Sequence, residues 1–290
     1  MFSVFCEELF AEKHANQLRR ASCQGMENAG ESSTDDISEQ IQDIKIVTTN
    51  NLAEDSPVKE EATDSKDSNK ESPFYDDAKK YWSKVPATVD GMLGGFGGIS
   101  YRDIKGSSSF LKDIFKMKPT VERRTAVDCG AGIGRVTKSL LFPLFQTVDM
   151  VEQDENFANS AREYLGGNAS QLGTIYNIGL QNFTPEPGKY DVIWCQWVLS
   201  HLTDEDLQAF LERASVGLAK NGVIVLKENV TSSGEIEVDT TDSSITRPLR
   251  KFQDIIQSAN LRIVKTIRQT DLPKGLYPIY MMALRPVRKS

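Results

Sequence analysis

The stretch "AVDCGAGIGRVTK", residues 126–138, joins an apolar run to three glycines, Gly130, Gly132 and Gly134, placed at every second position. Glycine has no Cβ, so a ligand can approach the backbone of such a loop closely. The apolar run before the loop predicts a strand, and the residues after it predict a helix. A strand, a glycine-rich turn and a helix in this order indicate a ligand-binding βα unit of an α/β protein.

The chain after this stretch alternates between strand-like and helix-like segments, which predicts βαβ units and a mostly parallel sheet. The predicted strands cover residues 125–130, 147–154, 173–180, 190–199, 221–229, 261–269 and 278–286. The predicted helices cover residues 133–145, 155–166, 203–218 and 247–260. Thr203 is the predicted N-cap of the third of these helices. Few residues separate the last two strands, so we expect them to form a hairpin with one antiparallel strand.

Two more helices are predicted before the glycine loop, with an unusual segment between them. Residues 72–85 carry apolar or aromatic side chains at helical spacing, including Tyr81 and Trp82. Residues 88–100, "TVDGMLGGFGGIS", contain five glycines and predict a loop, which we expect to close over bound ligands. Residues 107–117 predict a helix capped by serines.

The chain begins with an acidic segment that differs in composition from the rest. Between Glu27 and Ser72 it has 13 Asp and Glu against 4 Lys, a net charge of −9, so the remainder carries +2 of the total of −7. Residues 11–73 contain no aromatic side chain. Such a segment buries too little apolar area to offset chain entropy. We therefore expect residues 1–72 to be a disordered acidic tail, including the β-like run 43–52, and residues 73–290 to be the folded domain.

Cysteine and histidine usage argues against metal and disulfide sites. The chain has no CxxC pair, and its four cysteines and two histidines are Cys6, Cys23, Cys129, Cys195, His14 and His201. No zinc site and no disulfide framework are expected, and a reduced intracellular compartment fits this usage. No apolar run approaches the about 18 residues of a membrane span. The N-terminal residues are too acidic, and their apolar run too short, for a secretory signal.

The glycine loop has three candidate ligands: a nucleotide phosphate, a dinucleotide and S-adenosylmethionine (SAM). A P-loop needs a Lys followed by Ser or Thr after its last glycine, whereas Arg135 stands there in this chain. A dinucleotide loop reads GxGxxG, whereas this one reads GxGxG and follows Asp128. An acid at this position repels a pyrophosphate but suits a ligand that carries a sulfonium and an ammonium group. A tight turn that binds no ligand is the alternative for the loop taken alone.

A second acid strengthens the interpretation as a SAM site. Glu152 ends the next predicted strand, 22 residues after Gly130, where a carboxylate can accept both hydroxyls of a ribose. The segment "GLQNF", residues 179–183, follows the third strand and is placed to flank an adenine. Open α/β sheets bind their ligands outside the carboxyl ends of their strands, which is where both segments fall.

Several segments of the sequence resemble one family closely. They are "YWSKVPATVDGMLGGFGGIS", "DCGAGIGRVTK", "LLFPLFQTVDMVE", "LQNFTPEPGKYDVIWCQWVLSHLTD" and "NGVIVLKEN". Together they resemble the eukaryotic N-terminal Xaa-Pro-Lys N-methyltransferases over about residues 73–286. The resemblance implies the Rossmann-like fold of SAM-dependent methyltransferases, with a mostly parallel seven-stranded sheet, helices on both faces and N-terminal helical additions. It also implies transfer of methyl groups from SAM to the free α-amino group of proteins that begin Xaa-Pro-Lys after Met removal.

The resemblance also implies roles for individual residues. The implied SAM contacts are Gly130, Arg135, Glu152, Gln153, Asp154, Leu180, Gln181 and Gln196. The implied acceptor channel uses Tyr81, Trp82, Trp197, Glu228, Asn229, Asp239, Ser244 and Tyr277. The implied catalytic residues are His201 and Asp242, between which the proton of the acceptor amine is not assigned. Glu152 and Glu228 stand where the family commonly has Asp, and Thr240 stands where relatives can carry another acid.

Two other functions compete with this interpretation. One is a SAM-dependent methyltransferase that acts on a small molecule or another amine, and the other is a non-catalytic binding protein with a methyltransferase fold. The resemblance implies that the partners are protein N-terminal tails, with no nucleic acid and no membrane, and that the enzyme is a monomer or a weak dimer. It further implies action in the nucleus and the cytoplasm.

Overall fold

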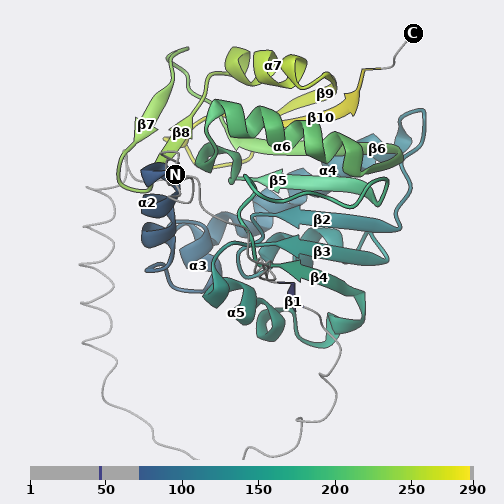
Figure 1. Ribbon diagram of the computed structural model, residues 1–290, viewed down its shortest axis with the longest axis horizontal. Coiled ribbons are helices and arrows are strands. Elements are labelled where there is room, and N and C mark those ends of the chain that lie inside the picture. The colour runs from purple at the N-terminus through teal and green to yellow at the C-terminus, as the bar shows by residue number, and fades with distance from the viewer. Residues whose placement is uncertain (1–45, 48–71, 288–290) are drawn as a thin grey trace, which may run out of the picture.

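The computed structural model describes residues 46–47 and 72–287 of the chain. The sheet that it contains has eight strands in the order β1-β4-β3-β2-β5-β6-β10-β9 (Figure 1). Seven of them are the predicted strands: β2 (Thr125–Cys129), β3 (Thr147–Val151), β4 (Leu172–Tyr176), β5 (Tyr190–Gln196), β6 (Leu218–Asn229), β9 (Leu261–Gln269) and β10 (Ile279–Pro286). The pairs β4-β3-β2-β5-β6 are parallel, and β10 is antiparallel to both β6 and β9, which confirms the predicted C-terminal hairpin.

The eighth strand comes from the acidic segment. β1 (Ile46–Val47) pairs in parallel with β4, so that Ile46 is opposite Ile175 and Val47 is opposite Tyr176. These two residues lie in the β-like run 43–52 of the segment expected to be a tail. Without β1, β4 would be an edge strand, which presents unpaired backbone groups that another strand can use. The remainder of the predicted tail, up to residue 71, lies outside the described residues.

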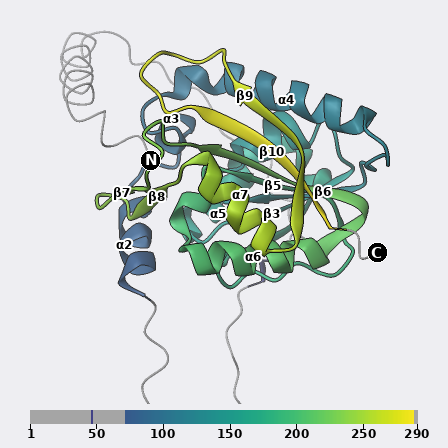
Figure 2. The ribbon, with the colours of Figure 1, turned by 90° about the horizontal axis from the view of Figure 1, so that it is seen from above.

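The helices lie on both faces of the sheet. They are α2 (Pro73–Trp82), α3 (Val89–Met92), α4 (Ser100–Lys116), α5 (Glu155–Leu165), α6 (Asp204–Gly217) and α7 (Leu249–Ser258). Figure 2 shows α4 on one side of the strands and α6 and α7 on the other. Two hydrophobic cores follow from this arrangement. One contains Phe110 of α4, and the other contains Phe210 of α6 and Phe252 of α7.

Four local elements differ from the sequence prediction. The segment 88–100, expected to be a loop, contains the short helix α3 and the 3-10 turn Gly97–Ile99, because Thr88 caps the N–H of Gly91. The helix α4 begins at Ser100 instead of residue 107 and contains Gly106, where an added Cβ would lie 2.8 Å from the Gln269 side chain. The helix predicted after the glycine loop contains a π-helical turn, Thr137–Leu141. The polar loop after β6 contains a second, small sheet, which is the hairpin of β7 (Glu237–Asp239) and β8 (Ser244–Thr246).

The strand order places a ligand-binding crevice at one end of the sheet. The chain runs from β2 outward to β4, and then returns to β5 on the other side of β2. In open α/β sheets, ligands bind at such a reversal, outside the carboxyl ends of the strands. Helix α2 and the β7–β8 hairpin lie together at one end of the sheet (Figure 1). The loops that follow β2, β3 and β5 therefore become the candidates for a binding site.

The amino-terminal ends of the central strands are joined by Asp191, and this contact yields a stability prediction. Asp191 is buried, and its Oδ2 accepts hydrogen bonds from the backbone N–H groups of Arg124 at 2.8 Å and Thr125 at 3.1 Å. Asp191→Ala leaves two backbone donors without their acceptor. We expect the free energy of unfolding, measured by urea denaturation, to fall by about 1–3 kcal/mol.

The matched control is Glu122→Ala. Glu122 lies 3.8 Å from the same Arg124, but its side chain is 63% exposed, so its removal should change the free energy of unfolding by less than about 0.5 kcal/mol. Equal losses in the two variants would contradict the role assigned to Asp191.

Candidate functional site

A cavity opens at the carboxyl ends of β2, β3 and β5. The glycine loop after β2 lines it, together with residues 151–153 at the end of β3, residues 178–181 after β4 and residues 196–198 at the end of β5. The lining is completed by Trp82 at the end of α2, by Met92 of α3, and by His201 and Leu202 after β5. Segments far apart in the sequence thus meet at the site that the strand order indicates.

The glycine loop requires glycine at two of its positions. Gly130 has φ of +68°, and a Cβ added there would lie 2.4 Å from the side chain of Val198. Gly132 has φ of +55°, and its added Cβ would lie 2.5 Å from Sδ of Met92. These φ values are rare for residues with a side chain. The loop therefore lies directly against the end of β5 on one side and against α3 on the other.

Glu152 occupies the floor of the cavity and holds the glycine loop. Its Oε2 accepts a hydrogen bond from the N–H of Gly132 at 2.8 Å, and its Oε1 accepts one from the N–H of Asp154 at 2.8 Å. Burial raises the pKa of Glu152 to about 7, although the two backbone donors oppose this rise. Its ionisation therefore changes near neutral pH. Asp154 caps α5 by accepting a hydrogen bond from the N–H of Phe157.

Asp128 is the penultimate residue of β2 and connects the strand to the turn that follows the glycine loop. Its Oδ2 accepts hydrogen bonds from the backbone N–H of Thr137 at 2.9 Å and from the Thr137 hydroxyl at 2.7 Å. Burial raises its pKa to about 6, against the effect of the Thr137 hydrogen bonds. Asp128 thus fixes the π-helical turn and also lines the cavity. Because Asp128 lines the cavity, its carboxylate is also accessible to a cationic group of a ligand.

The turn after β5 is strained and is held by a buried carboxylate. Trp197 has φ of +54°, a left-handed conformation that costs a residue with a side chain about 1–2 kcal/mol. Its N–H donates to the carbonyl of Lys227 at 3.0 Å. The N–H groups of Val198 and Leu199 both donate to Oε1 of Glu228 at 2.9 Å. Burial raises the pKa of Glu228 to about 7. These three hydrogen bonds hold the backbone of the turn in place, and Trp197 lines the cavity.

Arg247 holds the same turn from its other side. Its side chain is fully buried, and it donates to the carbonyls of Leu199 at 3.2 Å and Leu202 at 2.6 Å. Its Nε also donates to Oδ1 of Asp204 at 2.7 Å. The short helical turn Leu199–His201 is therefore fixed between the guanidinium of Arg247 and the carboxylate of Glu228. His201 is positioned by these two charged groups.

His201 is held in one tautomer by its neighbours. Its Nε2 lies 3.0 Å from Nε1 of Trp82, which can only donate, so Nε2 is the acceptor. Its Nδ1 lies 3.3 Å from the carbonyl oxygen of Ser243 and therefore carries the proton. Burial lowers the pKa of His201 to about 4, although Asp242 opposes this. His201 is consequently neutral at physiological pH, with its lone pair directed at the indole of Trp82.

The acids of the β7–β8 hairpin lie beside this pair. Asp242 is fully buried and acts electrostatically on both His201 and Tyr81. Burial raises the pKa of Tyr81, and the charges of Asp242 and Asp239 raise it further. Glu237 accepts a hydrogen bond from the hydroxyl of Tyr277 at 2.6 Å. The hairpin thus brings Asp239 and Asp242 close to Tyr81 and His201, while Glu237 pairs with Tyr277.

The structure brings most of the predicted site residues to the cavity. Those that line it are Gly130, Arg135, Glu152, Gln153, Leu180, Gln181, Gln196, Trp82, Trp197 and His201. The other predicted residues do not line it: Asp154, Tyr81, Glu228, Asn229, Asp239, Asp242, Ser244 and Tyr277. Asp154 and Glu228 make the backbone contacts described above. Asn229 and Ser244 are buried at the end of β6 and the start of β8.

Sequence reasoning missed four charged residues that support the site: Asp103, Asp204, Lys227 and Arg247. The sequence contains a signal for two of them, Asp103 and Lys227. Asp103 and Ser107 share the buried face of α4 with Phe110 and Leu111, and Lys227 interrupts the apolar strand "GVIVLKEN". An acid and a base, each at a buried position of its own element, indicate an ion pair in the core. Arg247 had no such signal, because its backbone acceptors are distant in sequence.

Comparison with known proteins gives close relatives. Residues 70–285 match the model of the family described as AdoMet-dependent proline di-methyltransferase. Alpha N-terminal protein methyltransferase 1 of Drosophila melanogaster is 52% identical over 223 residues, which are 76% of this chain and 79% of the relative. N-terminal Xaa-Pro-Lys N-methyltransferase 1 of Mus musculus is 48% identical over 216 residues, 74% of this chain and 96% of the relative.

Solved structures agree with these relatives. A SAM-dependent methyltransferase from Leishmania major has a TM-score of 0.69 and 36% identity, over 73% of this chain and 83% of that one. Phosphoethanolamine N-methyltransferase 1 of Haemonchus contortus has a TM-score of 0.59 and 17% identity, over 75% of this chain and 50% of that one. The second likeness shows the fold alone. The predicted SAM-dependent methyltransferase fold is therefore confirmed.

The contacts of Arg247 yield a prediction that separates it from an exposed neighbour. Arg247→Met removes a buried guanidinium and leaves the carbonyls of Leu199 and Leu202 without that donor. We expect the free energy of unfolding to fall by about 3 kcal/mol, as for other hydrogen bonds to buried charged groups. Chemical denaturation measures this loss.

Lys251→Met is the matched control, because Lys251 contacts the same Asp204 at 2.7 Å but its side chain is 36% exposed. Its removal should cost less than about 1 kcal/mol. An Arg247→Met protein as stable as the Lys251→Met protein would refute the role of Arg247 in holding the turn.

Proposed function

The chain belongs to the AdoMet-dependent proline di-methyltransferase family, and from this premise we propose that it transfers methyl groups from SAM to the free α-amino group of proteins beginning Xaa-Pro-Lys. One observation carries the proposal beyond family membership. A single cavity is lined at one end by the glycine loop and Glu152, and at the other by Trp82 and His201. This supports a cofactor and an amine acceptor that would share one space.

The residues of the cavity fit SAM. SAM supplies a methyl group on a positively charged sulfur, from which a nucleophile displaces it. The carboxylate of Glu152 would accept the ribose hydroxyls, Leu180 and Gln181 would flank the adenine, and Arg135 would bind the carboxylate of the methionine part. Arg135 is the only Lys or Arg that lines the cavity in the described part of the chain. It is therefore the cation available to that carboxylate.

The acceptor amine must lose a proton before it can attack. A protein α-amine has a pKa of about 7.7–8.0, so most of it is protonated at neutral pH. We propose that His201 and Asp242 together accept the proton that the acceptor amine loses. Trp82 Nε1–H donates to the lone pair of His201, so the indole would have to release Nε2 for this nitrogen to accept a proton from the amine. An imidazolium formed there would be stabilised by the buried carboxylate of Asp242.

Acceptor specificity would come from the shape and charge of the channel. Proline fixes its own φ and has no N–H, so a channel without an acceptor at that position suits it. Trp82 and Trp197 can exclude water and stabilise cationic groups through their ring faces. Asn229, buried at the end of β6, would read the proline residue, and Ser244 and Tyr277 would belong to the same channel. Asp239 and Glu237 provide the negative charge that would select a basic third residue.

We extend the proposal to the partners and compartment of the enzyme. Its partners would be the N-terminal tails of proteins, it would act as a monomer or weak dimer in the nucleus and cytosol, and it would not bind nucleic acid directly. The sequence resemblance supports these points. No helix in the described part of the chain has the length and apolar character that crossing a membrane requires.

The proposed activity predicts methylation of a peptide that begins Ser-Pro-Lys-Arg. After incubation with the full-length protein and SAM, mass spectrometry should detect one to three added methyl groups on the free peptide. The N-acetylated twin should gain none, because its nitrogen has no basic lone pair. Methylation of both peptides would place the acceptor on the Lys side chain, and would therefore overturn the α-amine assignment.

A second prediction concerns the pH dependence of nucleoside binding. The ionised form of Glu152 accepts the ribose hydroxyls, and its pKa is raised to about 7, so the ionised fraction falls as pH falls below 7. The Kd of 5′-methylthioadenosine, which carries no titrating amine or carboxylate, should rise about tenfold from pH 8 to pH 6. Isothermal titration calorimetry at pH 6, 7 and 8 measures it.

Glu152→Gln is the control for this pH dependence. At pH 8 the affinity of this variant for 5′-methylthioadenosine should be lower than that of the natural protein. Between pH 7 and 8 its Kd should also change much less than the Kd of the natural protein. A residual change near pH 6 is expected from Asp128, whose pKa is about 6. An unaltered slope between pH 7 and 8 in Glu152→Gln would mean that another group titrates.

A further inference from the structure

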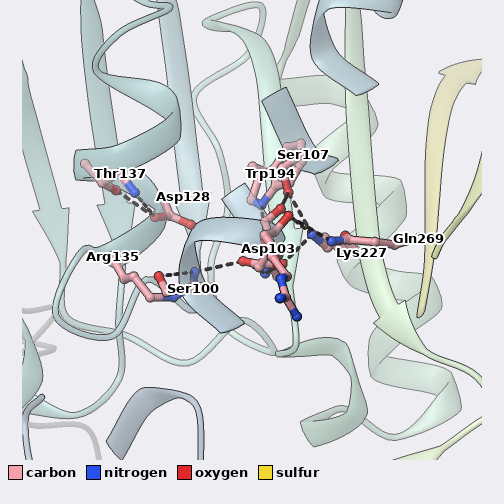
Figure 3. Close-up of polar contacts among 11 residues, drawn as sticks. Ser100, Asp103, Ser107, Asp128, Arg135, Thr137, Trp194, Lys227 and Gln269 are labelled. Atoms are coloured by element: carbon pink, nitrogen blue, oxygen red, sulfur yellow. Dashed lines mark hydrogen bonds and ion pairs between the residues drawn. The ribbon is translucent and has the colours of Figure 1, made fainter. Parts of the chain in front are cut away.

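A buried cluster of three charged side chains lies behind the cavity (Figure 3). Asp103 of α4 accepts hydrogen bonds from Lys227 of β6 and, at 2.8 Å, from Nη1 of Arg135. The side chains of Asp103 and Lys227 are fully buried, and that of Arg135 is 6% exposed. The cluster therefore lies almost entirely away from water, where charges interact strongly.

The polar atoms of the cluster are nearly all satisfied by one another. Lys227 donates to the backbone carbonyl of Asp103 at 3.1 Å, to its carboxylate, and to the Ser107 hydroxyl at 2.8 Å, which accounts for its three N–H groups. Gln196 Nε2 donates to the same carboxylate at 2.9 and 3.0 Å. Lys227 therefore has no direct contact left for a ligand. Any effect it has on binding must act through its charge.

Charge counting leaves one excess positive charge in this cluster, because two cations share one carboxylate. Asp128 also acts electrostatically on Arg135 and offsets part of this charge, but its hydrogen bonds go to Thr137, and the ion pairs of Arg135 and Lys227 are both with Asp103. The hydroxyls and the amide around the cluster, those of Ser100, Ser107 and Gln196, are neutral. A buried excess charge is unfavourable unless an anion can approach it.

The excess charge lies one side chain away from the cavity. Arg135 and Gln196 both contact Asp103, and both line the cavity. Trp197 also lines it, and the cationic groups of Arg135 and Lys227 lie 5.7 and 5.8 Å from its ring centroid. The cluster is therefore directly behind the wall against which an anionic ligand group would bind.

We propose that Lys227 is a positioning residue for the cofactor carboxylate, and that it acts by sharing Asp103 so that Arg135 keeps a positive charge for the ligand. Without Lys227, Asp103 would neutralise Arg135 alone, and the arginine would attract the carboxylate less strongly. The proposal rests on the SAM-binding part of the proposed function and not on the identity of the acceptor.

The test compares two ligands that differ by a single group. S-adenosylhomocysteine (SAH) carries the carboxylate, and its decarboxylated analogue 5′-(3-aminopropylthio)-5′-deoxyadenosine keeps the amine and lacks the carboxylate. For each protein, calorimetry gives the affinity for SAH divided by the affinity for the analogue, which we call the affinity ratio. In Lys227→Met this ratio should fall about tenfold, because only SAH loses an electrostatic attraction. Equal weakening of both ligands, or no change in the ratio, would overturn the proposal.

Two further variants keep the proposal testable if Lys227→Met does not fold. Asp103→Asn/Lys227→Met removes one charge of each sign, so the ratio should lie within about threefold of the natural one. Asp103→Asn alone adds a net positive charge, so its ratio should equal or exceed the natural one. A lower ratio in Asp103→Asn would show that Asp103 only orients Arg135, and would overturn the charge-sharing role.

Lys189→Met is the matched control. Lys189 also pairs with a buried acid, Asp149, at 2.8 Å, but it precedes β5 and does not line the cavity. Its loss should leave the affinity ratio unchanged, and a fall equal to that of Lys227→Met would overturn the proposal. If the natural protein binds neither ligand, the proposed function itself fails, and this result is distinct from a normal SAH affinity with an unaltered ratio in Lys227→Met.

Discussion

The carboxylate of Glu228 is the contact on which both halves of the site depend. It accepts the N–H groups of Val198 and Leu199 at 2.9 Å and so stabilises the turn that follows the strained Trp197. Gln196 and Trp197 before this turn and His201 after it all line the cavity, so the turn sets their relative positions. Because a left-handed tryptophan is unfavourable by itself, the turn needs a fixed acceptor in the core. A glutamate at the end of β6 is long enough to provide one.

Burial of these charged groups requires that they satisfy one another. Glu228 accepts from two N–H groups of the turn and Arg247 donates to two of its carbonyls, so these charged side chains add hydrogen bonds to a turn that has few of its own. The same principle applies behind the cavity, where Asp103 satisfies Lys227 and Arg135. Removal of one member leaves the others buried without partners, which costs more than the interaction itself contributes. The site is therefore as much a part of the folding energetics as the two apolar cores.

Much of the fold follows from local sequence pattern. The glycine loop, the seven strands and the C-terminal hairpin are readable because apolar periodicity and glycine placement act over a few residues. The start of α4 was misplaced because residues 88–100 are rich in glycine and the serines at 107–109 resemble a helix cap, whereas Asp103 is helical and buried through contacts with Arg135 and Lys227, which lie far along the chain. The pairing of Ile46 and Val47 with β4 depends likewise on a distant partner. The hydrogen bond from Trp82 to His201 spans 119 residues, and no local signal predicts it.

The carboxylates around the cavity differ in function because their surroundings differ. Glu152 and Asp128 are buried beside backbone N–H groups and a hydroxyl, and their raised pKa values place their ionisation close to neutral pH. Asp103 is surrounded by two cations, and the pKa of this carboxyl is lowered despite its burial. The methionine part of SAM is zwitterionic, so under the proposed function the cluster that contains Asp103 and Arg135 would attract its carboxylate, and Asp128 would be available to its amine. Opposite charges on the wall of one cavity would thus favour a single orientation of the ligand.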